Sequence, residues 1–357
     1  MNTTIETSSN LKQAWLDIQK AKPGIRIRDA AESIGCSEAE LLATTVNGYT
    51  TRLSGDWTKL FIRLPELGRI MSLTRNDSCV LEHKGPFQKI DIMGNAPNAM
   101  ATVIGPIESR VFFSVWKFGF AVRQETPHGL QQSLQFFDGA GNAITKIFLQ
   151  PPSGNKVGSN QEAFDSIVQD FRAEDQDTVL EVLPATDATS KKIDEVNKAA
   201  LIDDWTAMKD THDFFGMLRK HGVSRLDALY LAQDKFTYQI DKASLRVLLE
   251  RASAEKLPIM IFAGNKGNLQ IHQGKVQTIR VMDAWLNVLD PDFNMHLRED
   301  HVNTVWVVKK PTTDGTVTAI EVFDKKANMI VQFFGLRKPG ISELENWRKL
   351  VDDLPKS

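Results

Sequence analysis

Two hydrophobic periodicities alternate along this chain of 357 residues. Apolar residues at helical spacing predict amphipathic helices, whereas short runs of β-branched and aromatic residues beside Gly, Asn and Asp predict strands. The helical pattern covers Asn10–Lys20, Arg28–Ile34, Glu38–Thr44, Gln161–Phe171 and Ser342–Asp352. Strands are predicted at Arg69–Thr74, Cys79–His83, Ser133–Phe137 and Ala143–Leu149. Because the turns between paired strands are short, we expect antiparallel pairing.

The pattern occurs twice, at a spacing of about 190 residues, which indicates an internal repeat. Met71–Ile90 matches Met260–Ile279 without a gap, and this match pairs His83 with His272. Residues that recur in both copies are more often structural than functional. We therefore assign both histidines to the scaffold.

Helix starts also correspond between the copies. Ser37 with Glu40, and Ser224 with Asp227, have the spacing of N-terminal capping motifs. We predict an α+β fold with internal duplication, in which two similar halves each carry an antiparallel β-sheet flanked by α-helices, with a ligand cleft between them. The expected boundaries are 1–182 for the N-terminal repeat, 183–200 for the linker and 201–357 for the C-terminal repeat.

Composition narrows the function classes. The 43 basic and 45 acidic residues give a formal net charge of −2, which argues against a dominant role in binding nucleic acid or anionic membranes. The two cysteines, Cys36 and Cys79, lie far apart and indicate neither a disulfide framework nor a zinc site. The N-terminus lacks the pattern of a secretory signal, and no apolar run is long enough to span a bilayer. We expect a soluble cytoplasmic protein without membrane insertion.

His212 is the candidate metal ligand, because the first copy has Lys22 near the aligned position. Asp210 or Thr211 is expected to cap the helix that follows, which places His212 in the first turn. A histidine held there, off the apolar stripe, can serve as an axial ligand of a haem iron. The alternative, a surface histidine that only makes hydrogen bonds, remains open.

Haem binding needs an apolar slot, a neutral imidazole nitrogen and cations for the propionates. The aromatic residues available for a slot are Phe112, Phe113, Trp116, Phe333 and Phe334. The candidate cations are Lys309, Lys310, Arg337 and Lys338. Arg110 and His296 also differ between the copies, aligning near Asp300 and Pro106. Each residue also has an ordinary alternative role, in the core for the aromatic residues and on a solvated surface for the charged ones.

The order of several segments across both copies resembles the cytoplasmic haem-utilisation proteins of Gram-negative bacteria, the hemin-degrading factor or hemin transport protein family. The matching segments are Asp210–Phe215, Glu108–Arg110, Trp285–Val288, Phe293–Leu297, Lys310–Gly315 and Phe334–Arg337. The resemblance covers nearly the whole chain. It implies two stacked halves built on saddle-shaped antiparallel sheets, with one haem (iron protoporphyrin IX) between them.

The resemblance also implies residue roles. His212 matches the proximal iron ligand and a catalytic position, and Arg110 matches the catalytic distal arginine from the other half. Arg337 falls at a second distal arginine. His296, Lys309, Lys310 and Phe334 complete the expected cofactor-binding set. Phe334 stands where family members often have tyrosine, so a distal hydroxyl is missing.

By the same resemblance, the protein is expected to take part in bacterial haem-iron utilisation, degrading bound haem oxidatively with an external reductant to release iron. The alternative is a non-catalytic haem carrier that delivers haem to a haem oxygenase. Expected partners are therefore haem, an electron donor, and a haem oxygenase or an inner-membrane haem importer.

A third reading comes from Arg28–Leu41, which has the pattern of a helix-turn-helix DNA-binding motif. Its second helix begins with Glu38 and carries Glu40, where contacts to DNA would be expected. Acidic side chains repel the phosphate backbone. No nucleic-acid partner is therefore expected.

Overall fold

The computed structural model describes residues 2–184, 191–337 and 340–356. The chain divides into two compact units. Unit 1 comprises Met1–Arg75, Glu82–Thr186 and Gly264–Gln270, and unit 2 comprises Asn76–Leu81, Asp187–Ala263 and Ile271–Ser357. Each unit therefore includes one short segment from the other repeat. In the predicted linker, residues 185–190 lie outside the described residues, and the next long helix already begins at Lys198. The candidate cation Lys338 also lies outside the described residues.

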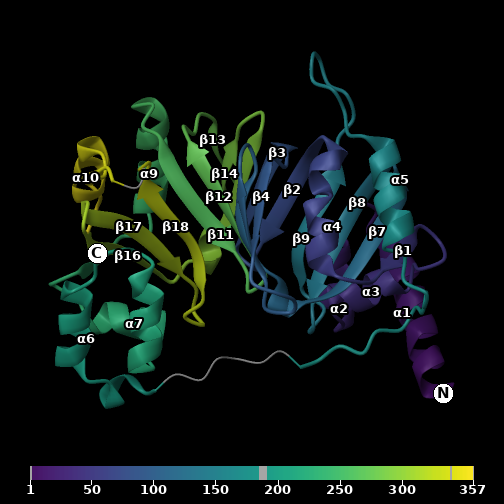
Figure 1. Cartoon of the computed structure of the whole chain (residues 1–357), viewed down its shortest axis with the longest axis horizontal. Helices are drawn as coiled ribbons and strands as arrows, with labels where there is room; N and C mark the ends of the chain where they lie inside the picture. Colours follow the sequence, from purple (N-terminus) through teal and green to yellow (C-terminus); the bar gives the residue numbers. More distant parts are fainter. Residues whose placement is uncertain (1, 185–190, 338–339, 357) are drawn as a thin grey trace. The chain divides into compact units, whose positions relative to one another are not determined.

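The first repeat contains five α-helices and nine strands among its described residues (Figure 1). The helices are α1 (Asn2–Ala21), α2 (Ile27–Ile34), α3 (Glu38–Ala43), α4 (Trp57–Ile62) and α5 (Gln161–Asp170). The strands are β1 (Thr50–Leu53), β2 (Arg69–Arg75), β3 (Cys79–Pro86), β4 (Lys89–Met93), β5 (Met100–Ile104), β6 (Glu108–Phe112), β7 (Trp116–Thr126), β8 (Gly129–Asp138) and β9 (Ala143–Leu149).

The second repeat has the same order of elements among its described residues. Its helices are α6 (Lys198–Thr206), α7 (Asp213–His221), α8 (Arg225–Leu231), α9 (Ser244–Ala254) and α10 (Glu345–Asp352). Its strands are β10 (Thr237–Ile240), β11 (Ile259–Gly264), β12 (Asn268–Gly274), β13 (Ile279–Met282), β14 (Trp285–Leu289), β15 (Phe293–Arg298), β16 (Thr304–Thr312), β17 (Gly315–Phe323) and β18 (Met329–Gly335). The α+β class and the duplication are therefore confirmed.

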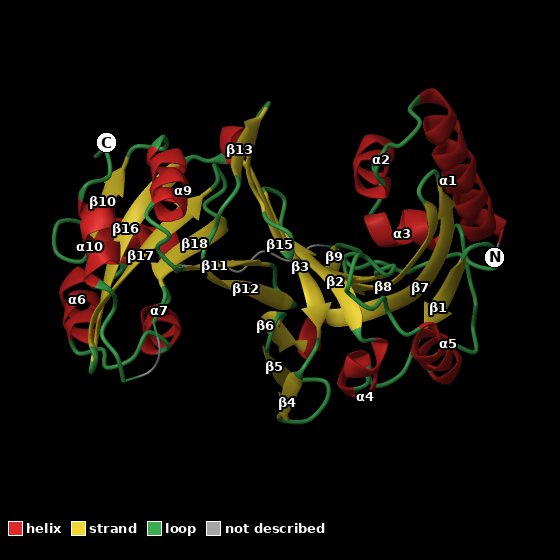
Figure 2. Cartoon of the chain, turned by 90° about the horizontal axis from the view of Figure 1, so that it is seen from above, coloured by secondary structure: helices red, strands yellow, loops and turns green. Residues whose placement is uncertain are grey.

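In unit 1, the antiparallel run β1-β7-β8-β9-β2 has helices on both faces. Helices α1–α3 lie on one side of it and α4 and α5 on the other (Figure 2). Ala39 and Leu42 of α3 pack against Phe120 and Phe137 of the sheet. These contacts remove apolar surface from water and so stabilise the packing of α3 on the sheet. A second antiparallel run, β4-β5-β6, forms a three-stranded meander.

Unit 2 repeats this arrangement with the run β10-β16-β17-β18-β11 and the meander β13-β14-β15. Successive residues of a strand point to opposite faces. Accordingly, Trp306 and Val308 of β16 pack with α6–α8, whereas Val305 and Val307 pack with α9 and α10. This alternation decides which side chains of the sheet can reach α7.

Each unit holds its segment from the other repeat through an asparagine. In unit 1, the side-chain amide of Asn265 donates to the carbonyls of Arg75 (2.9 Å) and Ile144 (2.8 Å). In unit 2, Asn76 donates to the carbonyl of Ile330 (2.8 Å). Gly267 allows the close approach in unit 1, because a Cβ there would lie 2.7 Å from Ile144. In both copies, therefore, an asparagine side chain that donates to backbone carbonyls holds the segment from the other repeat.

Several local predictions are confirmed. Strand β9 spans the predicted residues, and Ser37 and Glu40 form a complete capping box at α3. Ser224 accepts the backbone N–H of Asp227 at α8.

Five of the six residues of α3 are buried, so this helix has no free face to enter a DNA groove. Among the described residues, no helix combines the length and apolarity that crossing a membrane requires.

Candidate functional site

His212 is held in the loop directly before α7, where it is the N-cap rather than a first-turn residue. Its backbone N–H and its ring Nδ1 both lie close to Oδ1 of Asp210, at 2.8 and 2.5 Å. The imidazole is otherwise projected outward, because the side chain is 94% exposed. Asp210 thus accepts the N–H of the N-cap residue itself, and the prediction that Asp210 or Thr211 caps the first turn of the helix is wrong, because α7 has no side-chain cap among the described residues.

The contact with Asp210 determines which ring nitrogen of His212 is available. The hydrogen bond from the backbone of His212 lowers the pKa of Asp210, and the charges of His212 and Arg337 add to this effect. The carboxylate is therefore ionised at neutral pH and accepts the Nδ1–H. In the neutral ring Nε2 then carries the lone pair. A carboxylate behind a histidine is the usual second partner of a metal-ligating imidazole.

Arg337 fits an anionic ligand near the same loop. Its side chain is only 16% exposed and lies 3.9 Å from a carboxylate oxygen of Asp314. Its Nη1 is buried and has no hydrogen-bond partner among the described residues. Burying a cationic donor without a partner is costly. A carboxylate such as a haem propionate would satisfy this nitrogen, so the residues present fit the group.

A network of charged residues around Glu321 contacts α7 through Phe214. The carboxylate of Glu321 accepts two hydrogen bonds from Arg225 (2.7 and 2.7 Å), one from Lys310 (2.9 Å) and one from Gln332 (3.0 Å). Arg225 and Lys310 in turn lie 4.9 and 4.5 Å from the ring centroid of Phe214, which belongs to α7. Cation–π contacts of this kind fix the ring in place. The network therefore anchors the first turn after His212.

The same contacts shift the pKa values of Glu321 and Lys310. Burial alone would raise the pKa of Glu321, but the positive charges of Arg225 and Lys310 hold it well below its ordinary value. Burial lowers the pKa of Lys310 to about 8, and the charge of Glu321 limits this fall. Both groups are consequently charged at neutral pH. Lys310 was predicted to meet a propionate, but its ammonium is already occupied by Glu321.

The first repeat has a related pair with the charges reversed. Glu38, the residue after the N-cap of α3, pairs with Lys146 of β9, which lies opposite Gln135 of β8. In the second repeat Arg225 follows the N-cap of α8, and Glu321 lies opposite Gln332. The position after the N-cap is shared, but its partner differs: Lys146 is on β9, whereas Glu321 is on β17, where the first repeat has Gln135. In the second repeat the two cations also lie beside the ring of Phe214 in α7.

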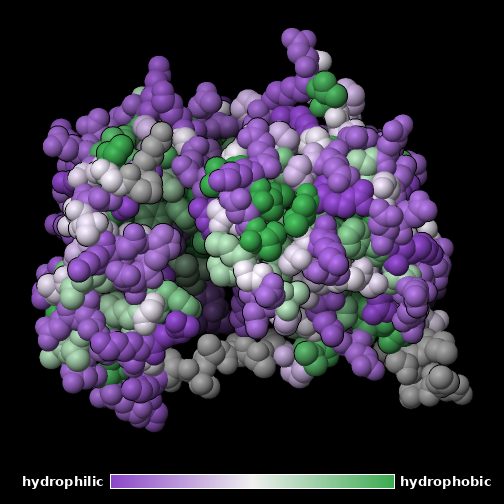
Figure 3. All heavy atoms as spheres, viewed as in Figure 1, coloured by the Kyte–Doolittle hydropathy of each residue, from purple (hydrophilic) through white to green (hydrophobic). Residues whose placement is uncertain are grey.

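In unit 1, Arg110 lies on one face of the β4-β5-β6 meander. The strand register places it opposite Thr102, and its guanidinium contacts the carbonyl of Ser109 (3.1 Å) and the carboxylate of Glu108 (3.3 Å). Strand alternation puts Met93, Met100 and Ile104 on the same face, where they are 49, 37 and 45% exposed. Hydrophobic surface gathers where β4 lies in the view of Figure 3.

Exposed apolar groups of this kind commonly mark a binding surface. The same face also carries Lys89, Asp91, Thr102 and Glu108, so it combines exposed apolar side chains with charged groups of both signs. Sequence reasoning identified Arg110 but missed the apolar residues beside it. A signal was present, because Lys89–Met93 and Met100–Ile104 have apolar residues in both phases of the strand alternation.

The other predicted residues lie in unit 2. Phe334 is on the α6–α8 face of the sheet, 5.9 Å from the ammonium of Lys310, and its ring meets that of Phe262 edge to face. His296 of β15 shares a hydrogen bond with Asn287 through Nδ1 (2.7 Å). Lys309 lies on the opposite face of β16 from Lys310, beside Tyr238. Asp210 thus contacts His212 and also feels the charge of Arg337, whereas Lys309 lies on another face of the sheet.

Comparison with known proteins gives consistent matches over nearly the whole chain. The model of the haemin-degrading HemS.ChuX domain matches residues 35–171 and 222–354. Hemin transport protein HemS of Yersinia enterocolitica is 32% identical over 344 residues, which is 96% of each chain. The crystal structure of holo-PhuS, a haem-binding protein from Pseudomonas aeruginosa, has a TM-score of 0.93 at 41% identity and covers 98% of this chain and 99% of that one. ChuS, described as an E. coli haem oxygenase, has a TM-score of 0.85 at 28% identity, with 97 and 99% covered.

Proposed function

The chain belongs to the haemin-degrading HemS.ChuX family, and we propose that it binds one haem through His212 and degrades that haem oxidatively in the bacterial cytoplasm to release iron. The observation that carries this proposal is the pairing of the His212 Nδ1 with Asp210, which leaves Nε2 of a highly exposed imidazole to ligate iron. Haem is thus the substrate as well as the bound group.

The remaining residues have separate roles in the proposal. Arg337 binds a propionate with its buried guanidinium, and Asp210 keeps the imidazole in the ligating tautomer. The Glu321 network holds Phe214, and with it the start of α7, in position. On the family resemblance, Arg110 would donate a hydrogen bond to the reacting group, and the exposed Met93, Met100 and Ile104 on its face of unit 1 would offer apolar contact to haem.

When bound, haem supplies the iron-dependent oxidation chemistry, for which an external electron donor is needed. The chain contributes binding, orientation and a fixed positive charge. His212 and Arg110 are accordingly the proposed catalytic residues. His296 and Phe334 stay in the proposed haem-binding set, on the family resemblance.

A carrier role is the second candidate. It is favoured by Phe334, which has no hydroxyl to donate a hydrogen bond. In this case the protein would receive haem from an inner-membrane importer and pass it to a haem oxygenase. The printed descriptions of the relatives include both kinds, since PhuS is called a haem-binding protein and ChuS a haem oxygenase.

Turnover distinguishes the two. Purified protein loaded with haem is given a reductant and oxygen, with catalase present to remove free peroxide. Loss of the Soret band with release of iron supports degradation. An unchanged Soret band, followed by transfer of haem to an added haem oxygenase, supports the carrier.

A further inference from the structure

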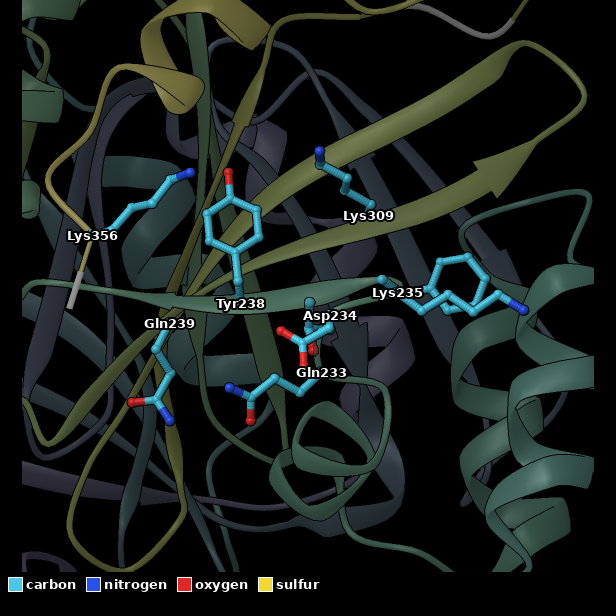
Figure 4. Close-up of a pocket in the computed structure, with 9 residues that line it drawn as sticks. Gln233, Asp234, Lys235, Tyr238, Gln239, Lys309 and Lys356 are labelled. Carbon is cyan, nitrogen blue, oxygen red and sulfur yellow. The ribbon is translucent and has the colours of Figure 1, made fainter.

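Unit 2 contains a cavity of about 550 Å³ beside β10, for which the proposed haem function has no use. It is lined by residues 233–239 together with Lys309 and Lys356 (Figure 4). Its volume is in the range of small-molecule sites. Lys309 projects from the face of β16 opposite Lys310, so this cavity is separate from the network beneath α7.

Two positive charges converge on one aromatic ring in this cavity. The ammonium groups of Lys309 and Lys356 lie 5.7 and 5.6 Å from the ring centroid of Tyr238. In Figure 4 both extend toward the side of β10 to which the Tyr238 hydroxyl points. Neither ammonium has a carboxylate partner among the described residues, in contrast to Lys310 with Glu321.

The other polar residues of the cavity lie apart from this group. Gln233, Asp234 and Gln239 are on the other side of the β10 ribbon (Figure 4). The ammonium of Lys235 lies 5.3 Å from the ring centroid of Phe236. Burial raises the pKa of Tyr238, and the charge of Asp352 adds to the rise. The phenol is therefore protonated at neutral pH and can donate a hydrogen bond.

We propose that Lys309, Lys356 and Tyr238 bind the phosphate group of a small molecule. Neither ammonium is ion-paired among the described residues, and the charge of Asp352 acts on Tyr238 rather than neutralising either lysine, so a dianion bound beside the ring would be attracted by both cations. Phosphate carries enough oxygens to accept from both ammonium groups and from the hydroxyl, and lysine binds phosphate well as a point charge. A single carboxylate would neutralise only one of the two charges.

Tyrosine labelling gives a direct test, because the chain has only three tyrosines. The full-length protein is labelled with ring-¹³C tyrosine and titrated with inorganic phosphate, with sodium chloride adjusted to keep ionic strength constant. We expect a saturable shift of the Tyr238 signal, assigned with Tyr238→Phe. The signals of Tyr49 and Tyr230 serve as internal references and should not move.

Substitutions complete the test. Lys309→Gln and Lys356→Gln should each raise the Kd for phosphate about tenfold, as expected for loss of a charged hydrogen bond. Lys325→Gln, at an exposed lysine outside the cavity, is the matched control and should leave the Kd unchanged. Equal shifts of all three tyrosines, no shift beyond that in chloride, or an unchanged Kd in both cavity variants would overturn the proposal.

A phosphate group is also present on lipid headgroups, and a second arm separates the two sources. The protein is sedimented with vesicles containing phosphatidylglycerol. We expect no cosedimentation. Binding to vesicles that is lost in Lys309→Gln and Lys356→Gln would replace the small-molecule assignment with a membrane surface.

Discussion

Nδ1 of His212 lies 2.5 Å from Oδ1 of Asp210, at the point where the chain enters α7. The same carboxylate oxygen accepts the backbone N–H of His212. Asp210 therefore controls both the position of the loop and the tautomer of the ring. The second repeat has this histidine at its exposed helix start, whereas the first repeat has Lys22 near the corresponding position.

Replacing Asp210 by alanine should weaken haem binding by about tenfold, because a ligating histidine loses its orienting carboxylate. The measurement is a haem titration followed by Soret absorption. Asp203→Ala, at an acidic residue on α6, is the matched control. Equal affinities for Asp210→Ala and the parent would show that the contact does not orient an iron ligand.

Glu321→Gln should lower the free energy of unfolding by about 3 to 5 kcal/mol, because the buried Lys310 and the half-buried Arg225 would lose their counter-ion. Urea unfolding measures the change. Amide exchange in α7 should also become faster, since the two cations position Phe214.

Glu345→Gln, at an exposed residue of α10, controls for loss of a carboxylate as such. Should Glu321→Gln prove as stable as this control, the network would not be the anchor of α7.

We expect the buried His272 to make the free energy of unfolding fall at acidic pH. Burial lowers its pKa to about 4 in the folded protein, from an ordinary value of 6.5. The unfolded chain therefore binds a proton between these values while the folded chain does not. The contribution is fully present above pH 6.5 and is lost as the pH falls toward 4, amounting to about 3 kcal/mol.

The test compares the pH dependence of urea unfolding for His272→Gln and for His128→Gln, which alters an exposed histidine. The first variant should lose less stability than the parent between pH 6.5 and 4, and the second should follow the parent. Parallel curves for all three proteins would contradict the assignment.

If the proposed role of Arg110 holds, Arg110→Ala should reduce haem turnover about 100-fold while haem still binds, because the proposal makes this guanidinium a preorganised donor at the reacting centre. Single-turnover decay of the Soret band, with reductant, oxygen and catalase, measures the rate. Arg123→Ala, at an arginine paired with Asp165 on the surface of unit 1, is the control. Unchanged turnover in Arg110→Ala would argue against a catalytic role and favour the carrier.

Local features of this fold were predictable from sequence because they depend on near neighbours. The capping box of Ser37 and Glu40 and the strand β9 follow from short patterns. His83 and His272 were assigned to the scaffold because they recur, and both are buried. The α+β class was predictable because helical and strand patterns recur in the same order in both copies.

Features that depend on distant partners were not predictable. Lys309 and Lys310 look equivalent in the sequence, but strand alternation sends one to Tyr238 and the other to Glu321. The contact of Asn265 with Arg75 and Ile144 joins residues from different repeats, which no local periodicity encodes.

The central claim is that the imidazole of His212 ligates haem iron. The most direct measurement is a haem titration of the parent, His212→Ala and His128→Ala, followed by Soret absorption. We predict that the parent and His128→Ala give the same sharp, saturable Soret band at one haem per chain, and that His212→Ala loses it with a fall in affinity greater than that of Asp210→Ala. An unchanged band position and affinity in His212→Ala would contradict the account.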